Sequence, residues 1–184
     1  MMISLSSCSG QKWSKFNCDG SGKCLGIKFS IKYPTNWEKR DGDHPHIIIN
    51  FGHEEKRGYV KMVVYLKKFD ETPTQSDINN IYSKDYLLNL FKVKKIIEFN
   101  DQAKIEDERG VYATVQVEDI MYDSTIRTIV KTNLLIWKDY LFQINFFIFS
   151  NDQSFGTMND MYNDYNEVFR EIMVSLVINS KWEK

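Results

Sequence analysis

The side chains best suited to chemistry in this chain are its histidines, which lie close together. The sequence has three histidines, His44, His46 and His53, and Asp41 and Asp43 precede the first two. Imidazole nitrogens and carboxylate oxygens together form a ligand set that zinc and copper accept. In an extended segment His44 and His46 share one side, and together with Asp41 or Asp43 they are candidate ligands for a weakly bound metal.

The spacing of the histidines limits this hypothesis. His53 follows His46 by seven positions, and an extended strand of that length spans roughly 23 Å. Two histidines and one aspartate offer at most three ligands, whereas a structural zinc site uses four and a catalytic one needs its three held by further hydrogen bonds. The alternative interpretation is a solvated loop with ordinary histidines. We therefore expect no tightly bound metal and no cofactor.

The sequence contains no signature of a common enzyme class. A Gly-rich phosphate loop, a Gly-x-Ser-x-Gly elbow, His-Glu-x-x-His and Cys-x-x-Cys are all absent. We assign no catalytic residue for this reason. An enzyme, either a hydrolase or a metal-dependent one, with a site assembled from scattered residues remains the alternative.

The cysteines carry information about the compartment. Cys8 ends the segment Leu-Ser-Ser-Cys, which resembles a bacterial lipobox, although the residues before it are too few for an apolar signal region and include no basic residue. A coincidental match is the alternative interpretation. Cys18 and Cys24 flank a segment with two glycines, which can turn tightly enough to bring the two thiols within disulfide range.

An odd cysteine count leaves one thiol without a partner unless that residue has another fate. Lipidation of Cys8 would leave Cys18 and Cys24 as a pair among the three cysteines. A lipid anchor and a disulfide both indicate an oxidising cell envelope. Three free thiols in a cytoplasmic protein are the alternative.

Composition excludes two classes of partner. The formal net charge is −1 and basic residues are not clustered, so the chain lacks the positive surface that binds nucleic acid through phosphates. The most apolar run, residues 141–149, is far shorter than a membrane span and is interrupted by Gln143 and Asn145. We expect membrane contact only through a lipid anchor.

The hydrophobic pattern predicts a series of strands and two helical segments. Period-two alternation predicts strands over residues 27–33, 59–69, 93–99, 103–106, 111–121 and 126–137. The apolar run that follows His46, residues 47–53, predicts a further strand. Residues 141–149 are apolar on both sides, which predicts a central strand covered above and below. Helical spacing predicts helices over residues 78–91 and 158–176, and the second should pack on the sheet through its Met-rich and aromatic face.

Three stretches in this order carry a resemblance to a known family. They are residues 26–37 (Gly-Ile-Lys-Phe-Ser-Ile-Lys-Tyr-Pro-Thr-Asn-Trp), residues 108–113 (Glu-Arg-Gly-Val-Tyr-Ala) and residues 169–178. The arrangement resembles the PsbP-like family, which contains the extrinsic photosystem II subunit, bacterial relatives and a Ran-binding eukaryotic branch. The resemblance covers most of residues 25–178. It implies an α+β fold, an antiparallel β-sheet with helices packed on both faces in an α/β/α sandwich, and accessory or binding roles without a shared catalytic set.

These observations lead to one expected organisation and function. Residues 1–25 form an N-terminal segment, a lipoprotein tether under the lipobox hypothesis, and residues 26–184 form a single PsbP-like domain. We expect a non-enzymatic accessory or binding protein of the bacterial cell envelope that recognises a protein partner or a small ligand. The alternatives are the enzyme described above and a cytosolic interaction protein.

Overall fold

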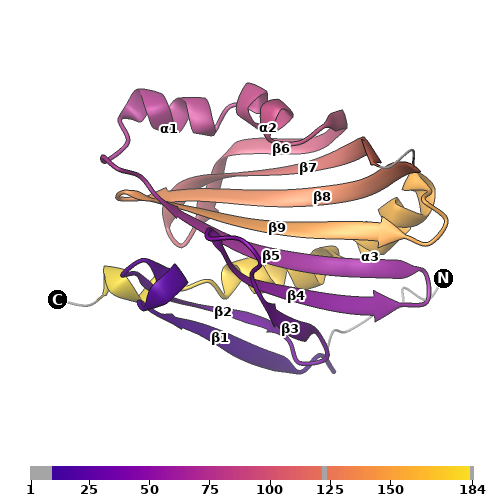
Figure 1. Cartoon of the computed structure of the whole chain (residues 1–184), viewed down its shortest axis with the longest axis horizontal. Helices are drawn as coiled ribbons and strands as arrows, with labels where there is room; N and C mark the ends of the chain where they lie inside the picture. Colours follow the sequence, from indigo (N-terminus) through magenta and orange to yellow (C-terminus); the bar gives the residue numbers. More distant parts are fainter. Residues whose placement is uncertain (1–9, 122–123, 183–184) are drawn as a thin grey trace, which may run out of the picture.

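The computed structural model describes residues 10–121 and 124–182, excluding the side chain of residue 121 (Figure 1). The helices are α1 (Gln75–Ile81), α2 (Lys84–Leu90) and α3 (Phe155–Val174), with single 3-10 turns η1 (Gly22–Cys24) and η2 (Asn179–Lys181). The strands are β1 (Trp13–Asp19), β2 (Lys28–Pro34), β3 (Glu38–Asp41), β4 (Ile47–Glu55), β5 (Gly58–Lys68), β6 (Val93–Ile105), β7 (Glu108–Met121), β8 (Ser124–Trp137) and β9 (Tyr140–Ser150).

The strands form two antiparallel sheets. Seven strands pair in the order β3-β4-β5-β9-β8-β7-β6, and β1 pairs with β2 in a separate two-stranded sheet. The predicted antiparallel pairing of the segments now seen as β4 and β5 is confirmed. The central position predicted for residues 141–149 is also confirmed, because β9 lies between β5 and β8.

Strand β9 contributes to a core on each face of the large sheet. Phe142, Ile144 and Phe146 are buried in the larger cluster, which also contains residues of α3. Leu141 belongs to a second cluster, which contains Tyr82 and Leu87 from the α1–α2 region. Alternate side chains of one strand point to opposite faces, so an apolar run such as β9 requires cover on both.

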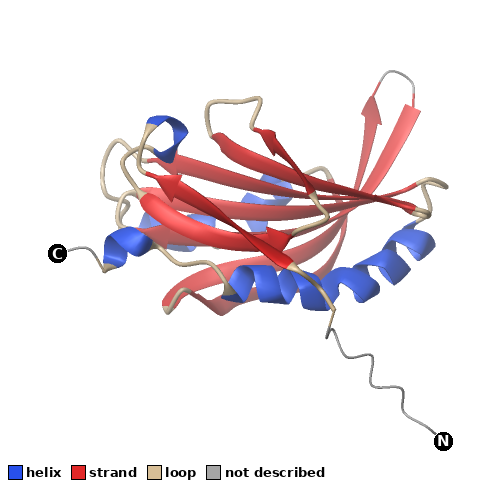
Figure 2. Cartoon of the chain, turned by 90° about the horizontal axis from the view of Figure 1, so that it is seen from below, coloured by secondary structure: helices blue, strands red, loops and turns tan. Residues whose placement is uncertain are grey.

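Helix α3 packs lengthwise on one face of the large sheet, as Figure 2 shows. Its buried side chains are Met158, Met161, Phe169 and Ile172. Phe169 stacks on Phe146 with ring centroids 4.3 Å apart. The prediction that this helix packs on the sheet is confirmed. No helix in the described part of the chain is both long and apolar enough to cross a membrane.

The expected α/β/α sandwich, with helices packed on both faces of the sheet, is wrong. Strands dominate the fold, and the face under α3 is shared with the β1–β2 sheet, whose residues join the same cluster. Within residues 10–121 and 124–182, the opposite face carries the short α1 and α2 alone, beside β6 at one end of the sheet (Figure 1). The predicted helix over residues 78–91 divides because Ser83 begins α2 as its N-cap, with its side chain accepting from the Tyr86 N–H.

The ordered fold begins before the boundary expected at Gly26. Strand β1 pairs with β2 over its whole length, from Trp13 opposite Pro34 to Asp19 opposite Lys28. A hairpin returns the chain between them, so residues on both sides of that boundary belong to one sheet. The alternating stretch that includes β2 also lies outside the seven-stranded sheet.

Candidate ligand-binding cleft

The candidate metal ligands His44 and His46 lie in a different part of the structure from His53. His44 and His46 are exposed on the loop before β4, and His53 lies within β4. The His46 ring lies 5.4 Å from the Tyr65 ring, and the His53 ring lies 6.4 Å from that of Tyr165. Among the described residues no three His, Cys, Asp or Glu side chains are grouped as metal ligands.

Lys23 forms hydrogen bonds with backbone carbonyl groups of the loop that carries His44 and His46. The Lys23 ammonium donates to the carbonyl oxygens of Gly42, His44 and Ile47, the last two at 3.2 and 3.3 Å. These acceptors are therefore engaged by a cation that the chain itself supplies. The contact ties the loop after β1 to the loop before β4.

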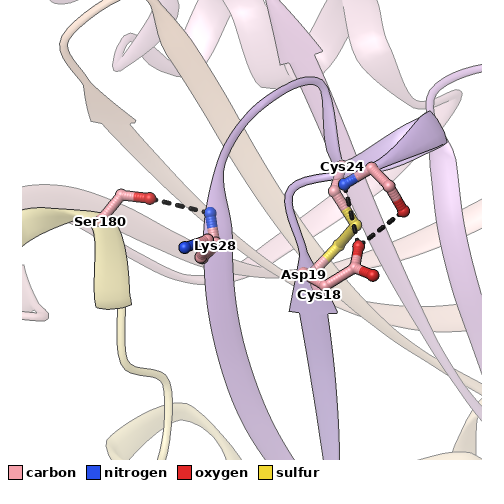
Figure 3. Close-up of a disulfide and its surroundings, with 6 residues drawn as sticks. Cys18, Asp19, Cys24, Lys28 and Ser180 are labelled. Atoms are coloured by element: carbon pink, nitrogen blue, oxygen red, sulfur yellow. Dashed lines mark hydrogen bonds between the residues drawn. A yellow bond between two sulfur atoms is a disulfide. The ribbon is translucent and has the colours of Figure 1, made fainter. Parts of the chain in front are cut away.

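Cys18 and Cys24 are joined by a disulfide, with their Cα atoms 5.9 Å apart (Figure 3). Asp19 accepts hydrogen bonds from the Ser21 N–H and hydroxyl, at 2.8 and 2.7 Å, which holds the turn between the cysteines. The Ser21 hydrogen bonds lower the pKa of Asp19. Cys8 lies outside the described residues.

A cleft lies on the α3 side of the sheet and has a volume of about 840 Å³. Its walls come from the end of β6 and the turn after it, from the last turns of α3 and from the segment after α3, and its floor comes from β7 and β8. We call it the α3 cleft. It is lined by Glu98, Asn100, Gln102, Ala103, Lys104, Ile105, Glu106, Asp107, Tyr112, Lys131, Asn133, Asn166, Phe169, Arg170, Met173, Val174, Leu176, Val177 and Trp182.

Lys131 is the central polar group on the floor of the α3 cleft. Its ammonium donates to the Tyr162 hydroxyl at 3.3 Å and to the Asn166 side-chain oxygen at 3.1 Å. It also lies 5.4 Å from the centre of the Tyr112 ring and 5.6 Å from that of the Tyr162 ring. These neutral groups fix the position of the cation without neutralising its charge.

Neighbouring side chains hold the floor in place. The Tyr162 and Thr114 hydroxyl oxygens are 3.1 Å apart and hydrogen bonded. The Tyr112 hydroxyl donates to Glu98 at 2.8 Å. This hydrogen bond, aided by burial, raises the pKa of Tyr112, so the phenol stays protonated and keeps donating.

The outer edge of the α3 cleft is apolar. Val174, Val177 and Trp182 are 73%, 38% and 70% exposed, and all three lie in the cleft lining. Large apolar side chains that are exposed singly are ordinary, but a group of them along one concave surface indicates a contact surface. We call Val174, Val177 and Trp182 the lip of the cleft. The apolar lip and the charged floor together give the cleft an amphipathic lining.

The segment that carries this lip is anchored at two places. Ser30 and Val177 exchange two backbone hydrogen bonds of 2.9 Å, so the chain after α3 pairs with β2. Glu106 accepts from the Ile178 N–H at 2.8 Å, and Lys181 donates to the Glu106 carbonyl at 2.7 Å. The cleft wall is therefore preformed.

The described lining of the cleft contains no His, Cys, Ser or Thr. It therefore lacks the hydroxyl or thiol paired with an imidazole that serine and cysteine hydrolases use. Its polar groups are amides, a phenol, carboxylates and cations, which can hold a ligand by hydrogen bonds and charge. Sequence reasoning missed the cleft, because Lys131 occupies an ordinary strand position and its partners Tyr162 and Asn166 come from a distant helix.

No protein-family model matches the chain, and no curated protein matches it in sequence. Its structure is similar to that of the Saccharomyces cerevisiae Ran-binding protein Mog1p, with a TM-score of 0.56 and 8% identity over 91% of this chain and 96% of Mog1p. A protein from Bacteroides thetaiotaomicron aligns with a TM-score of 0.44 and 15% identity, over 92% of this chain and 50% of that one. The likeness to Mog1p supports the PsbP/Mog1-like fold indicated by the sequence.

Proposed function

We propose that the chain is a non-enzymatic binding protein of the bacterial cell envelope that holds a small ligand in the α3 cleft. The observation that carries this proposal is the cleft itself, which combines an apolar lip with a cation held in place by neutral groups. Its volume of about 840 Å³ falls within the range of small-molecule sites. Mog1p, which shares the fold, is a Ran-binding protein, but one fold hosts many functions, so the proposal rests on the cleft.

The location in the envelope rests on a separate observation. The disulfide between Cys18 and Cys24 is a bond that persists in oxidising compartments and is rare in the cytoplasm of mesophiles. The lipobox-like segment ending at Cys8 supports the same location.

Native mass spectrometry tests the binding function. The chain is incubated with a small-molecule extract of bacterial envelope, and a bound compound should appear as a discrete mass and be recovered with its mass unchanged. The double variant Val174→Asp, Trp182→Ala should lose that adduct, because both side chains are exposed parts of the lip. The variant Lys15→Met, on β1, should keep it. Absence of any adduct, or recovery of a chemically altered compound, contradicts the proposal.

A protein partner is the second candidate, and the open face of the large sheet favours it. Tyr59, Tyr65 and Phe149 are half-buried and belong to neither core cluster. Phe149 stacks against Phe147 on this face. A photo-crosslinking amino acid at position 149 should then give one defined protein adduct in envelope extracts that the same group at position 15 does not give. Identical adduct patterns at the two positions contradict this candidate.

A further inference from the structure

We infer that the α3 cleft binds a small monocarboxylate with an apolar body, whose carboxylate pairs with Lys131. This inference rests on the proposed binding function and names the chemical class of its ligand. It follows from the hydrogen-bonding state of one ammonium group, from the charges around it and from the apolar lip beside it.

The first step concerns the hydrogen bonds of Lys131. An ammonium group has three donors, and the structure gives it two acceptors, the Tyr162 hydroxyl and the Asn166 side-chain oxygen. Neither acceptor is charged, and Lys131 forms no ion pair with any of the described carboxylates. A ligand carboxylate supplies both the third acceptor and the missing negative charge, in a charge-assisted hydrogen bond stronger than a neutral one.

The second step concerns the other charged residues of the lining. Arg170 is paired with Glu167 and Glu171, and the Glu106 and Glu108 side chains are paired with Lys181. Glu98 accepts the Tyr112 hydroxyl. Lys104 and Asp107 are exposed at the rim. Lys131 is thus the half-buried cation on the floor whose hydrogen-bond partners are both neutral, so it can pair with an anionic ligand.

The third step distinguishes a carboxylate from a phosphate. Phosphate sites favour arginine forks and helix N-termini. The α3 cleft has the opposite arrangement, because α3 lines it with its last turns, up to Val174. The C-terminal end of a helix carries partial negative charge, so a singly charged head group suits this site better than a doubly charged one.

The fourth step concerns the rest of the ligand. Met173 and Leu176 line the cleft beside the exposed Val174, Val177 and Trp182. Burying apolar surface of a ligand there removes it from water and favours binding. The ligand body is therefore apolar, and a fatty or aromatic acid has the required chemistry.

Calorimetric titration with octanoate tests the inference, with 1-octanol as the uncharged probe of equal chain length. Octanoate should bind the wild-type chain at one site. Lys131→Met should weaken octanoate by about tenfold or more, the loss of one charge-assisted hydrogen bond, and change octanol by less than about twofold, because the methionine keeps the apolar stem. The matched variant Lys15→Met should leave both probes unchanged.

A second measurement uses the wild-type chain alone, so that it stands if Lys131→Met fails to fold. Octylammonium has the opposite charge and should bind at least about tenfold more weakly than octanoate, by the same charge-assisted contribution. Equal binding of the two, no binding of octanoate, or octanoate binding that Lys131→Met leaves intact overturns the inference. If octanoate does not bind, an N-acetylated apolar tripeptide with a free carboxylate shows whether the cleft accepts a peptide carboxylate instead, which would also contradict the inference of a small monocarboxylate.

The two proposals fail in different ways. If envelope extracts give a cleft-dependent adduct while octanoate does not bind, the carboxylate inference is wrong and the binding function stands. If no adduct forms from any extract, the binding function itself fails.

Discussion

Gly52 and Gly58 lie in the β4–β5 hairpin, where an added methyl group would meet a different kind of atom at each position. A Cβ on Gly52 would lie 1.8 Å from the Tyr59 hydroxyl oxygen, and a Cβ on Gly58 would lie 2.0 Å from the Phe149 carbonyl oxygen. The first obstacle is the end of a side chain, which can rotate away. The second is backbone of the neighbouring strand β9, which pairs with β5 along its whole length.

We therefore predict that Gly58→Ala lowers the free energy of unfolding by about 1–3 kcal/mol, the usual cost of overpacking. Gly52→Ala should cost less, because only Tyr59 has to move. Urea unfolding of both variants measures the difference. Equal losses at the two positions would show that β9 yields as readily as a tyrosine side chain.

Tyr165 on α3 is a partly buried tyrosine whose pKa is strongly raised. Burial raises its pKa to about 12, and the nearby Glu55 carboxylate contributes to the rise. The Tyr165 hydroxyl donates to Glu55 at 3.4 Å. Both effects disfavour the phenolate, because burial penalises charge and the carboxylate repels it.

This pKa predicts how stability depends on pH. Between pH 10.0, the ordinary tyrosine value, and about 12 the folded chain keeps the Tyr165 proton while the unfolded chain releases it. The unfolded state then binds fewer protons, so the free energy of unfolding falls as pH rises through this interval, and the contribution is complete below it. Tyr165→Phe should make the fall shallower in urea titrations at successive pH values. An unchanged slope would contradict the assignment.

Helix α3 is the element whose packing can be tested most directly. Phe169 is fully buried and stacked on Phe146, so Phe169→Ala should cost about 3–5 kcal/mol, as core aromatic truncations do. Val168→Ala, at a half-buried position beside it, should cost markedly less. A loss below about 1 kcal/mol for Phe169→Ala, measured by chemical denaturation, would mean that this face of α3 is not part of the core.

The sequence predicted elements where one local pattern persists over several turns or a whole strand. Helix α3 and strand β9 are of this kind, because α3 keeps its helical apolar spacing over several turns and β9 is apolar on both sides along most of its length. The turn between β6 and β7 lies at Glu106 and Asp107, which both have positive φ. That conformation usually selects Asn or Gly, so two acidic residues gave no signal of a turn.

The candidate site could not be predicted in the same way. Lys131 acquires its character from Tyr162 and Asn166, which lie 31 and 35 positions away. Only the packing of α3 on β8 brings these groups together. The position of the lip likewise depends on the pairing of Val177 with Ser30. This contact joins two short segments, and no hydrophobic pattern in the sequence predicts it.

At the scale of the molecule, the small β1–β2 sheet takes the place of a helical layer beside α3. Phe29 and Ile31 of β2 are buried in the same cluster as α3. The expected sandwich, which the family resemblance implied, assigned both faces of the large sheet to helices. The alternation in β2 gave no indication that this strand joins a separate sheet. Strand pairing over long sequence distances is a tertiary property.

The disulfide closes the loop between β1 and β2, and it carries the last prediction. Cys18 pairs with Phe29 near the end of the β1–β2 sheet. Lys23, inside the disulfide loop, donates to the carbonyl groups of the loop before β4 and so connects the small sheet to the large one. Opening the bond frees a loop with a sequence separation of six, and chain entropy sets the cost at about 2 kcal/mol.

We predict that Cys18→Ser, Cys24→Ser lowers the free energy of unfolding by about that amount in urea titrations. Lys23→Met should lower it by less, since the Lys23 hydrogen bonds are exposed. In the protein isolated from its native host, thiol labelling under denaturing, non-reducing conditions should leave positions 18 and 24 unmodified. Full labelling at both positions would show reduced cysteines in the native compartment, and the envelope location would then lose the support of the disulfide, because a cytoplasmic protein keeps such thiols free.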